Sequence, residues 1–136
     1  QLGNDSSCVL RIENADHSVL LTGDIERYAE TQLVQRSLHE LSANILVAPH
    51  HGSKTSSLPR FLMAVHPDFV LYPIGYRNRY HFPHTNVMDM YQQLGAQQYD
   101  TASSGAISFD MIPGEPLNPP QLYRYQHWRY WLHSNH

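Results

Sequence analysis

The sequence holds a single cysteine, Cys8, so no disulfide can form within this chain of 136 residues. It also lacks any apolar run near the roughly 20 residues that a membrane-spanning helix needs. No leader with a charged and then an apolar part opens it. Charged residues make up only 15% of the chain and hydrophobic residues 41%, a balance typical of a globular protein. We therefore expect a soluble domain with its own core, and its start without methionine suggests that it is cut from a larger protein.

Positive charge is scarce too. The chain has 9 Lys and Arg against 12 Asp and Glu, a formal net charge of -3. Proteins that bind nucleic acid through their overall charge are basic. A nucleic-acid partner of this chain would need a local basic patch or a bound cation. Histidine, by contrast, is abundant with 10 residues, and imidazole is both a metal ligand and a proton carrier.

Apolar residues recur along the chain with the periods of strands and of helices. We expect strands over residues 7–13, 18–22, 45–48, 69–72, 98–101 and 106–111. We expect helices over residues 26–41, 56–65 and 86–94. Strands alternating with helices predict an α/β fold, and hairpins expected at both ends predict a mixed sheet.

Prolines set the last part of the chain apart. Four of them fall within residues 113–120, and both tryptophans follow. Because proline interrupts regular structure, we expect residues 1–112 to form the domain and residues 113–136 to form a proline-rich linker and an aromatic tail.

A carboxylate follows the second predicted strand, in Thr22-Gly23-Asp24. Positions at strand ends line the binding crevices of open α/β sheets, and a carboxylate there can bridge two metal ions. The alternative is that Asp24 caps the helix that follows it.

Two imidazoles follow the third predicted strand, where Pro49 and Gly52 bracket His50 and His51. Neutral imidazole is a leading ligand of zinc and is accepted by manganese. Neighbouring side chains point in different directions, so we expect one to bind a metal and the other to contact substrate or a ligand. The alternative is a polar surface loop.

A basic and aromatic loop over residues 76–84 is the third candidate. Arginine holds phosphate through paired hydrogen bonds, and aromatic rings stack on bases. The alternative is a solvated loop whose tyrosines pack on the core.

These segments, in this order, resemble the metallo-β-lactamase-like domain of the ComEC family of DNA-uptake proteins. The resemblance spans about residues 4–111, and its matching pieces are residues 20–26, 48–56, 75–84 and 101–107. It implies half of an αββα sandwich, a mixed sheet with helices on one face. It also implies DNA handling in a domain of a bacterial inner-membrane protein on the periplasmic or extracellular face, with degradation of the strand that is not transported.

The resemblance also implies roles for particular residues. Asp24 falls on the metal-bridging aspartate and His51 on the late metal-binding histidine. We expect His50 and His84 to take part in catalysis. Substrate is expected to contact Lys54, Arg77, Asn78, Arg79 and His81.

The family's principal metal motif, His-x-Asp-x-Asp-His, is absent from this sequence. We therefore expect a divalent metal, zinc or manganese, in the complete domain, none bound in this chain, and no activity of the chain alone. Half a sandwich leaves a sheet face bare, which favours a homodimer. The other expected partners are DNA, as a single strand or duplex end, and the rest of the parent membrane channel.

Two functions remain open from the sequence. The first is one part of a metal-dependent phosphodiesterase. The second is a non-catalytic module in which the loop over residues 76–84 and the aromatic tail hold single-stranded DNA.

Overall fold

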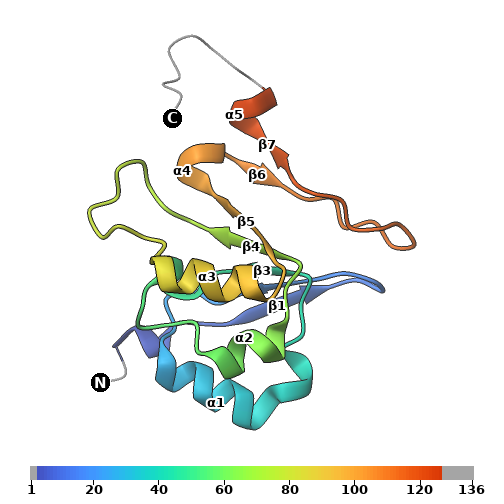
Figure 1. Ribbon diagram of the computed structural model, residues 1–136. Helices are drawn as coiled ribbons and strands as arrows, with labels where there is room; N and C mark the ends of the chain where they lie inside the picture. The colour runs from blue at the N-terminus through green and yellow to red at the C-terminus, as the bar shows by residue number, and fades with distance from the viewer. Residues whose placement is uncertain (1–2, 127–136) are drawn as a thin grey trace.

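A five-stranded sheet forms the centre of the computed structural model, which describes residues 3–126 (Figure 1). The strands lie side by side in chain order: β1 (Leu10–Glu13), β2 (Ser18–Leu21), β3 (Ile45–Val47), β4 (Phe69–Tyr72) and β5 (Gln97–Asp100). β1 and β2 form an antiparallel hairpin, whereas β2 to β5 are parallel to one another. The predicted α/β class and mixed sheet are confirmed.

Three helices connect the parallel strands and lie on one side of the sheet (Figure 1). They are α1 (Arg27–Ser37), α2 (Pro59–Val65) and α3 (Thr85–Gln93). Shorter helical turns are η1 (Gly3–Ser6), η2 (Leu38–Glu40), η3 (Pro49–Gly52), α4 (Thr101–Ser104) and α5 (Tyr123–Gln126). None of the helices in residues 3–126 is long and apolar enough to cross a membrane.

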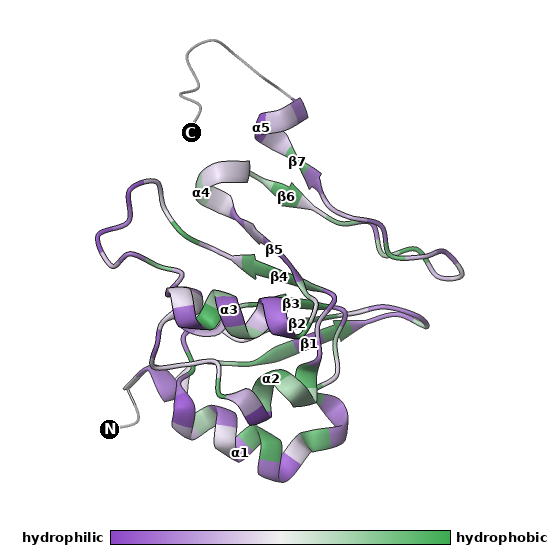
Figure 2. Ribbon diagram, viewed as in Figure 1, coloured by the Kyte–Doolittle hydropathy of each residue, from purple (hydrophilic) through white to green (hydrophobic). Residues whose placement is uncertain are grey.

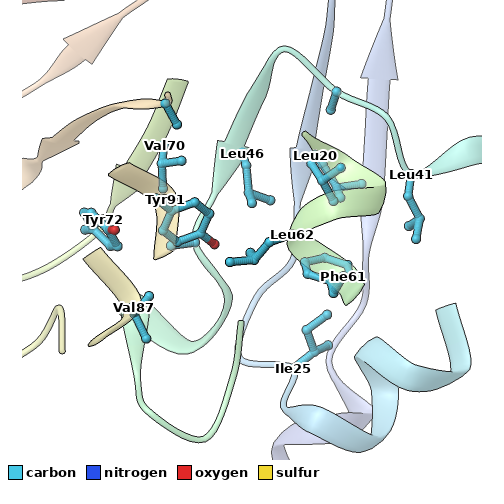
Figure 3. Packing of buried hydrophobic residues seen from close by; sticks show 14 residues of the cluster. Leu20, Ile25, Leu41, Leu46, Phe61, Leu62, Val70, Tyr72, Val87 and Tyr91 are labelled. Carbon is cyan, nitrogen blue, oxygen red and sulfur yellow. The ribbon is translucent and has the colours of Figure 1, made fainter. Parts of the chain in front are cut away.

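The core lies between this sheet face and the helices (Figure 3). Leu20, Leu46 and Val70 are register partners in β2, β3 and β4, so they form one row facing the helices. Phe61 and Leu62 of α2 pack over this row and are fully buried. Each such side chain contributes about 1.5–3 kcal/mol by leaving water, so this row and its cover fix the position of the strand ends.

The opposite face of the sheet is apolar but only partly covered. We call it the outer face, and its residues alternate with those of the core: Leu10, Ile12, Val19, Leu21, Ile45, Val47, Phe69 and Leu71. Leu10 is 53% exposed and Ile12 46%, although Phe109 packs edge-on against Phe69. Figure 2 shows the hydrophobic colouring of these strands.

The strand predicted over residues 106–111 is present only at residues 107–108, and its predicted hairpin with residues 98–101 is wrong. The chain leaves β5 through α4, whose first turn is capped by Asp100 Oδ1, which accepts from the Ser103 N–H at 2.7 Å. β6 (Ile107–Ser108) instead pairs with β7 (Gln121–Leu122) in a second, two-stranded sheet. The small residues before Gly105 favour a capped turn over a hairpin loop, so the main sheet ends at β5.

The proline-rich segment returns to the first hairpin. Asn14 Nδ2 donates to the Met111 carbonyl at 2.8 Å, and the Gly114 N–H donates to Asp16 Oδ2 at 2.6 Å. His17 Nε2 lies 2.8 Å from the Glu115 carbonyl oxygen. Residues 111–115 are therefore held against the turn between β1 and β2. Most of the predicted aromatic tail, residues 127–136, lies outside the described residues.

Candidate functional site

The site lies at the edge of the sheet where the parallel strands end. Asp24 follows β2, His50 and His51 follow β3, and the loop over residues 73–84 follows β4. Since neighbouring parallel strands finish at the same edge, the three segments meet there, as the sequence predicted. Backbone hydrogen bonds join them: the His50 N–H donates to the Gly23 carbonyl at 3.0 Å, and the His84 N–H to the Gly52 carbonyl at 2.9 Å.

The backbone at the two histidines is unusual. His50 has φ 46° and His51 φ 55°, both in the left-handed region that residues with a Cβ rarely adopt. Such strain costs roughly 1–3 kcal/mol per residue and persists only where the surroundings hold it. Gly52 closes the turn at φ 83°, and a Cβ there would lie 2.7 Å from Pro83 Cβ. The turn is thus pressed against the next loop.

His51 faces Asp24. Its Nε2 lies 3.2 Å from Asp24 Oδ1, and its Nδ1 lies 2.7 Å from the Pro73 carbonyl oxygen. A carbonyl oxygen only accepts hydrogen bonds, so Nδ1 carries the ring hydrogen. In a neutral ring Nε2 then carries a lone pair. A lone pair facing a carboxylate requires either a second ring proton or a cation shared by the two groups. The side chains are 39% and 44% exposed, so the pair is open to solvent.

His50 faces a different carboxylate, that of Glu26. His50 Nδ1 lies 2.9 Å from Glu26 Oε1, which also accepts from the Thr55 hydroxyl at 3.0 Å. The expectation that the two imidazoles diverge is therefore confirmed. Sequence reasoning missed Glu26. No local pattern marked it, because its partners His50 and Thr55 lie 24 and 29 residues away in the sequence.

Asp24 does not cap the helix that follows it, so that alternative is wrong. Asp5 Oδ1 does so instead, accepting from the N–H groups of Glu26 at 2.7 Å and Ala29 at 3.1 Å. This arrangement leaves the Asp24 carboxylate free to face His51.

The loop after β4 brings aromatic rings to the pair. Asn78 brackets Phe82: its Oδ1 accepts from the Phe82 N–H at 2.7 Å, and its Nδ2 donates to the Phe82 carbonyl at 2.9 Å. The Phe82 ring lies edge-on to His50 at 5.7 Å and stacks on His51 at 6.2 Å between ring centroids. Tyr80 in turn stacks on Phe82 at 5.5 Å. A row of rings thus leads to the histidines.

Two hollows flank this arrangement. The first, which we call the Asp24 hollow, has a volume of about 560 Å³ and is lined by Asp24, His50, His51, Asn78, Tyr80 and Phe82, among others. The second, the Lys54 hollow, has a volume of about 730 Å³, and its lining includes Glu26, Arg27, Lys54, Thr55 and His84.

The hollows divide the predicted site residues into groups. Asp24, His50, His51 and Asn78 line the first, and Lys54 and His84 the second. Arg77, Arg79 and His81 stand on the exposed part of the loop, outside these two linings. His84 Nδ1 accepts from the Asn86 N–H at 3.4 Å, so His84 caps α3. The structure therefore does not place His84 beside Asp24 and His51.

A metal-binding set is incomplete. Imidazole and carboxylate are suitable ligands for zinc or manganese, and the Nε2 atom of His51 faces the Asp24 carboxylate. Within residues 3–126, however, no group of three or more His, Cys, Asp or Glu side chains could hold a metal ion. The described residues bring together one imidazole and one carboxylate, and not a full set of ligands.

A buried carboxyl group supports the segment beyond the histidines, and sequence reasoning missed it as well. Glu30 of α1 is fully buried and accepts from the N–H groups of Ser57 at 2.6 Å and Leu58 at 2.7 Å. Burial raises the pKa of Glu30 to about 7, against the opposing effect of these hydrogen bonds. Through these two hydrogen bonds Glu30 holds the segment over residues 53–58 in place, and this segment positions Thr55 next to Glu26.

Comparison with known proteins gives a consistent set of relatives. The chain is 37% identical to "Competence protein ComA" of Neisseria gonorrhoeae over 111 residues, which are 82% of the chain and 16% of that protein. It is 35% identical to "ComE operon protein 3" of Bacillus subtilis over 106 residues, 78% of the chain and 14% of the relative. "Recombination protein 2" of Haemophilus influenzae is 38% identical over 104 residues, 76% of the chain and 13% of the relative.

These matches support a place in the ComEC competence family. No protein-family model matches the chain. The chain spans about a seventh of the length of these relatives, so the ComEC relationship concerns one region of much longer proteins.

Proposed function

We propose that this chain handles DNA during uptake and contributes Asp24 and His51 to a divalent-metal site that hydrolyses phosphodiester bonds in the complete domain. The observation that carries the proposal is the approach of His51 Nε2 to Asp24 Oδ1, at 3.2 Å. The His51 ring donates its hydrogen to the Pro73 carbonyl, so its other nitrogen turns a lone pair toward the Asp24 carboxylate. A cation bound between the two groups would interact favourably with both. The names of the competence relatives support DNA uptake as the context.

The metal, zinc or manganese, would supply an activated water and stabilise charge on phosphate oxygens. Asp24 and His51 would hold it together with ligands from outside residues 3–126. His50, fixed through Nδ1 by Glu26, keeps Nε2 as the atom that exchanges a proton with substrate. By itself the chain would turn over no substrate, because two ligands bind a metal weakly.

Phosphate groups would be held at the rim of the site. Arg77 and Arg79 are exposed on the loop beside the Asp24 hollow, and Lys54 lines the hollow next to it. Guanidinium groups pair with phosphate through two hydrogen bonds. In this proposal Asn78, which brackets Phe82, sets the loop's shape, while His81 and His84 contact the nucleic acid further from the metal.

The rest of the domain would cover the outer face of the sheet, where Leu10 and Ile12 are about half exposed. We propose that the chain is one half of a two-sheet domain of an inner-membrane channel, on the periplasmic or extracellular face. A homodimer through the same face is the expected state of the chain alone.

A specific observation favours a second function, a non-catalytic module for single-stranded DNA. The loop carries two arginine–tyrosine pairs, with the Arg77 guanidinium 5.2 Å from the Tyr76 ring centre and that of Arg79 4.8 Å from the Tyr80 ring centre. Such a module would bind DNA without metal, and binding would survive Asp24→Ala.

Titration calorimetry with Mn²⁺ tests the metal proposal directly. At high Mn²⁺ concentration we expect binding of one ion per chain, too weak to hold a metal at low concentration, and lost in Asp24→Ala and in His51→Ala. Asp89→Ala is the matched control, because it removes an exposed carboxylate from α3. Mn²⁺ binding that is equal in the wild type and in Asp24→Ala would contradict the proposal.

A further inference from the structure

We propose that Tyr80 and Phe82 form a stacking platform that holds an unpaired nucleobase at the entrance of the hollow that Asp24 and His51 line. The inference rests on the proposed function and narrows its ligand to single-stranded DNA, including the frayed end of a duplex. In this inference the aromatic rings of the loop, together with its arginines, recognise that ligand.

Three rings follow one another in nearly parallel planes. The Tyr80 and Phe82 centroids are 5.5 Å apart with an interplanar angle of 20°, and those of Phe82 and His51 are 6.2 Å apart at 17°. Tyr80 is 60% exposed although it is a large aromatic residue. The row therefore begins in solvent and ends at the ring that faces Asp24.

The platform is preorganised. The Asn78 side chain donates one hydrogen bond to the Phe82 backbone and accepts another from it, and the His81 N–H donates to the Asn78 carbonyl at 3.2 Å. The backbone bond from His84 to Gly52 joins the end of the loop to the histidine turn. A ligand that stacks on rings already in place does not have to order them, which strengthens binding. Figure 1 shows the loop extending away from the sheet between β4 and α3.

The arginines complete the surface. The Arg79 guanidinium lies over the Tyr80 ring, and its Nη2 donates to the Tyr80 hydroxyl at 2.6 Å. A base that stacks on Tyr80 takes the place of this guanidinium and frees it for the adjacent phosphate. Arg77 precedes Arg79 by two residues in the same loop. The loop therefore combines aromatic rings with positive charges although the net charge of the chain is -3.

The shape of the site favours an unpaired base. Inside a duplex both faces of each base are stacked on neighbours, so no face is open to Tyr80. A single strand exposes its base faces, and stacking on aromatic side chains tolerates any sequence. Tyr80 and Phe82 line the same hollow as Asp24 and His51, so a strand whose base stacks on Tyr80 lies at the entrance of that hollow.

Fluorescence anisotropy with three labelled probes tests the platform. The probes are a twelve-nucleotide oligothymidine, an abasic strand of the same length and a duplex hairpin, all at low salt with EDTA present. We expect the wild type to bind oligothymidine most tightly. One lost stack should weaken that binding about 5- to 150-fold in Tyr80→Ala and leave binding of the abasic strand unchanged. Tyr80→Phe, which keeps the ring, should retain the preference.

The outcomes separate the platform from the proposed function. If Tyr80→Ala binds oligothymidine as tightly as the wild type does, the platform is overturned and DNA handling stands. If the wild type binds none of the three probes, the proposed function fails and the platform fails with it. Because Tyr80 is largely exposed, the variant should fold, as circular dichroism will show.

A second measurement needs no variant. Oligothymidine with one 2-aminopurine should lose base fluorescence on binding the wild-type chain through contact with the ring. Binding without quenching at any position of the probe would overturn the platform.

Discussion

Two adjacent imidazoles, His50 and His51, face two different carboxylates. The left-handed backbone at both histidines makes this possible, because it turns the side chains apart. Gly52 enables the turn to sit against the next loop, with the Tyr72 ring 2.9 Å from where its Cβ would be. The geometry of the candidate site therefore depends on backbone that is held in an unfavourable region by its neighbours.

Gly52→Ala should destabilise the chain more than Gly95→Ala. Both glycines have positive φ, 83° and 78°, so both substitutions carry similar backbone strain of roughly 1 kcal/mol. At Gly52 the new methyl group also meets Pro83 and Tyr72, whereas nothing lies within 4 Å at Gly95. We expect about 2 kcal/mol more loss at Gly52, measured by urea unfolding. Equal losses would show that the histidine turn is not tightly packed.

Glu30 should make stability depend on pH. Its pKa is raised from 4.5 to about 7 in the folded chain, so the folded state binds more protons than the unfolded state between these values. Its stabilising contribution is therefore complete below about pH 4.5 and declines as pH rises toward 7.

Urea unfolding at pH 5 and pH 8 measures this effect against Glu30→Gln. The other side chains are the same in both proteins, so the difference between them isolates Glu30. We expect the wild type to lose stability relative to the variant from pH 5 to pH 8, by an amount on the order of 3 kcal/mol. A constant difference would contradict the assignment.

Elements whose apolar residues repeat regularly were predicted from the sequence. The first hairpin, α2, β4 and α3 lie within a few residues of their expected positions, because their apolar faces pack on the core. The hairpin predicted between residues 98–101 and 106–111 was wrong, because the capped turn at Asp100 follows β5 and β6 pairs with β7 instead. The convergence of Asp24 with the histidines followed from the shared edge of parallel strands. Glu26 and Glu30 were missed because their partners lie 24 to 29 residues away.

Two carboxylates near the start of α1 have different roles: Asp5 caps the helix, and Asp24 belongs to the candidate site. Asp5→Ala removes the acceptor for two helix N–H groups and should cost about 0.5–2 kcal/mol. Asp24 caps no helix, so Asp24→Ala should lower the free energy of unfolding by less in the same thermal or urea unfolding experiment. A larger loss in Asp24→Ala would mean that Asp24 is structural.

At the scale of the whole molecule, the outer face of the sheet is apolar and partly exposed to solvent. The central strands β3 and β4 are apolar on both sides, as in a sheet covered on both faces, but α1, α2 and α3 lie on one side (Figure 1). Exposed apolar surface of this kind favours association.

Self-association should therefore depend on this face. We expect sedimentation velocity to show a dimer that grows with concentration, weakened in Leu10→Ser/Ile12→Ser. Leu38→Ser is the control, because Leu38 is similarly exposed at 48% but lies in η2, away from the sheet. A wild-type chain that stays monomeric at high concentration would contradict this prediction.

The central proposal is that Asp24 and His51 together bind one metal ion. Nuclear magnetic resonance of the chain during Mn²⁺ addition tests it most directly, because the paramagnetic ion broadens signals near its site. We predict that the amide signals of residues 24 and 51 broaden first and together, and that Asp24→Ala removes the effect at residue 51. Broadening that begins at other histidines and leaves residues 24 and 51 sharp would contradict the account.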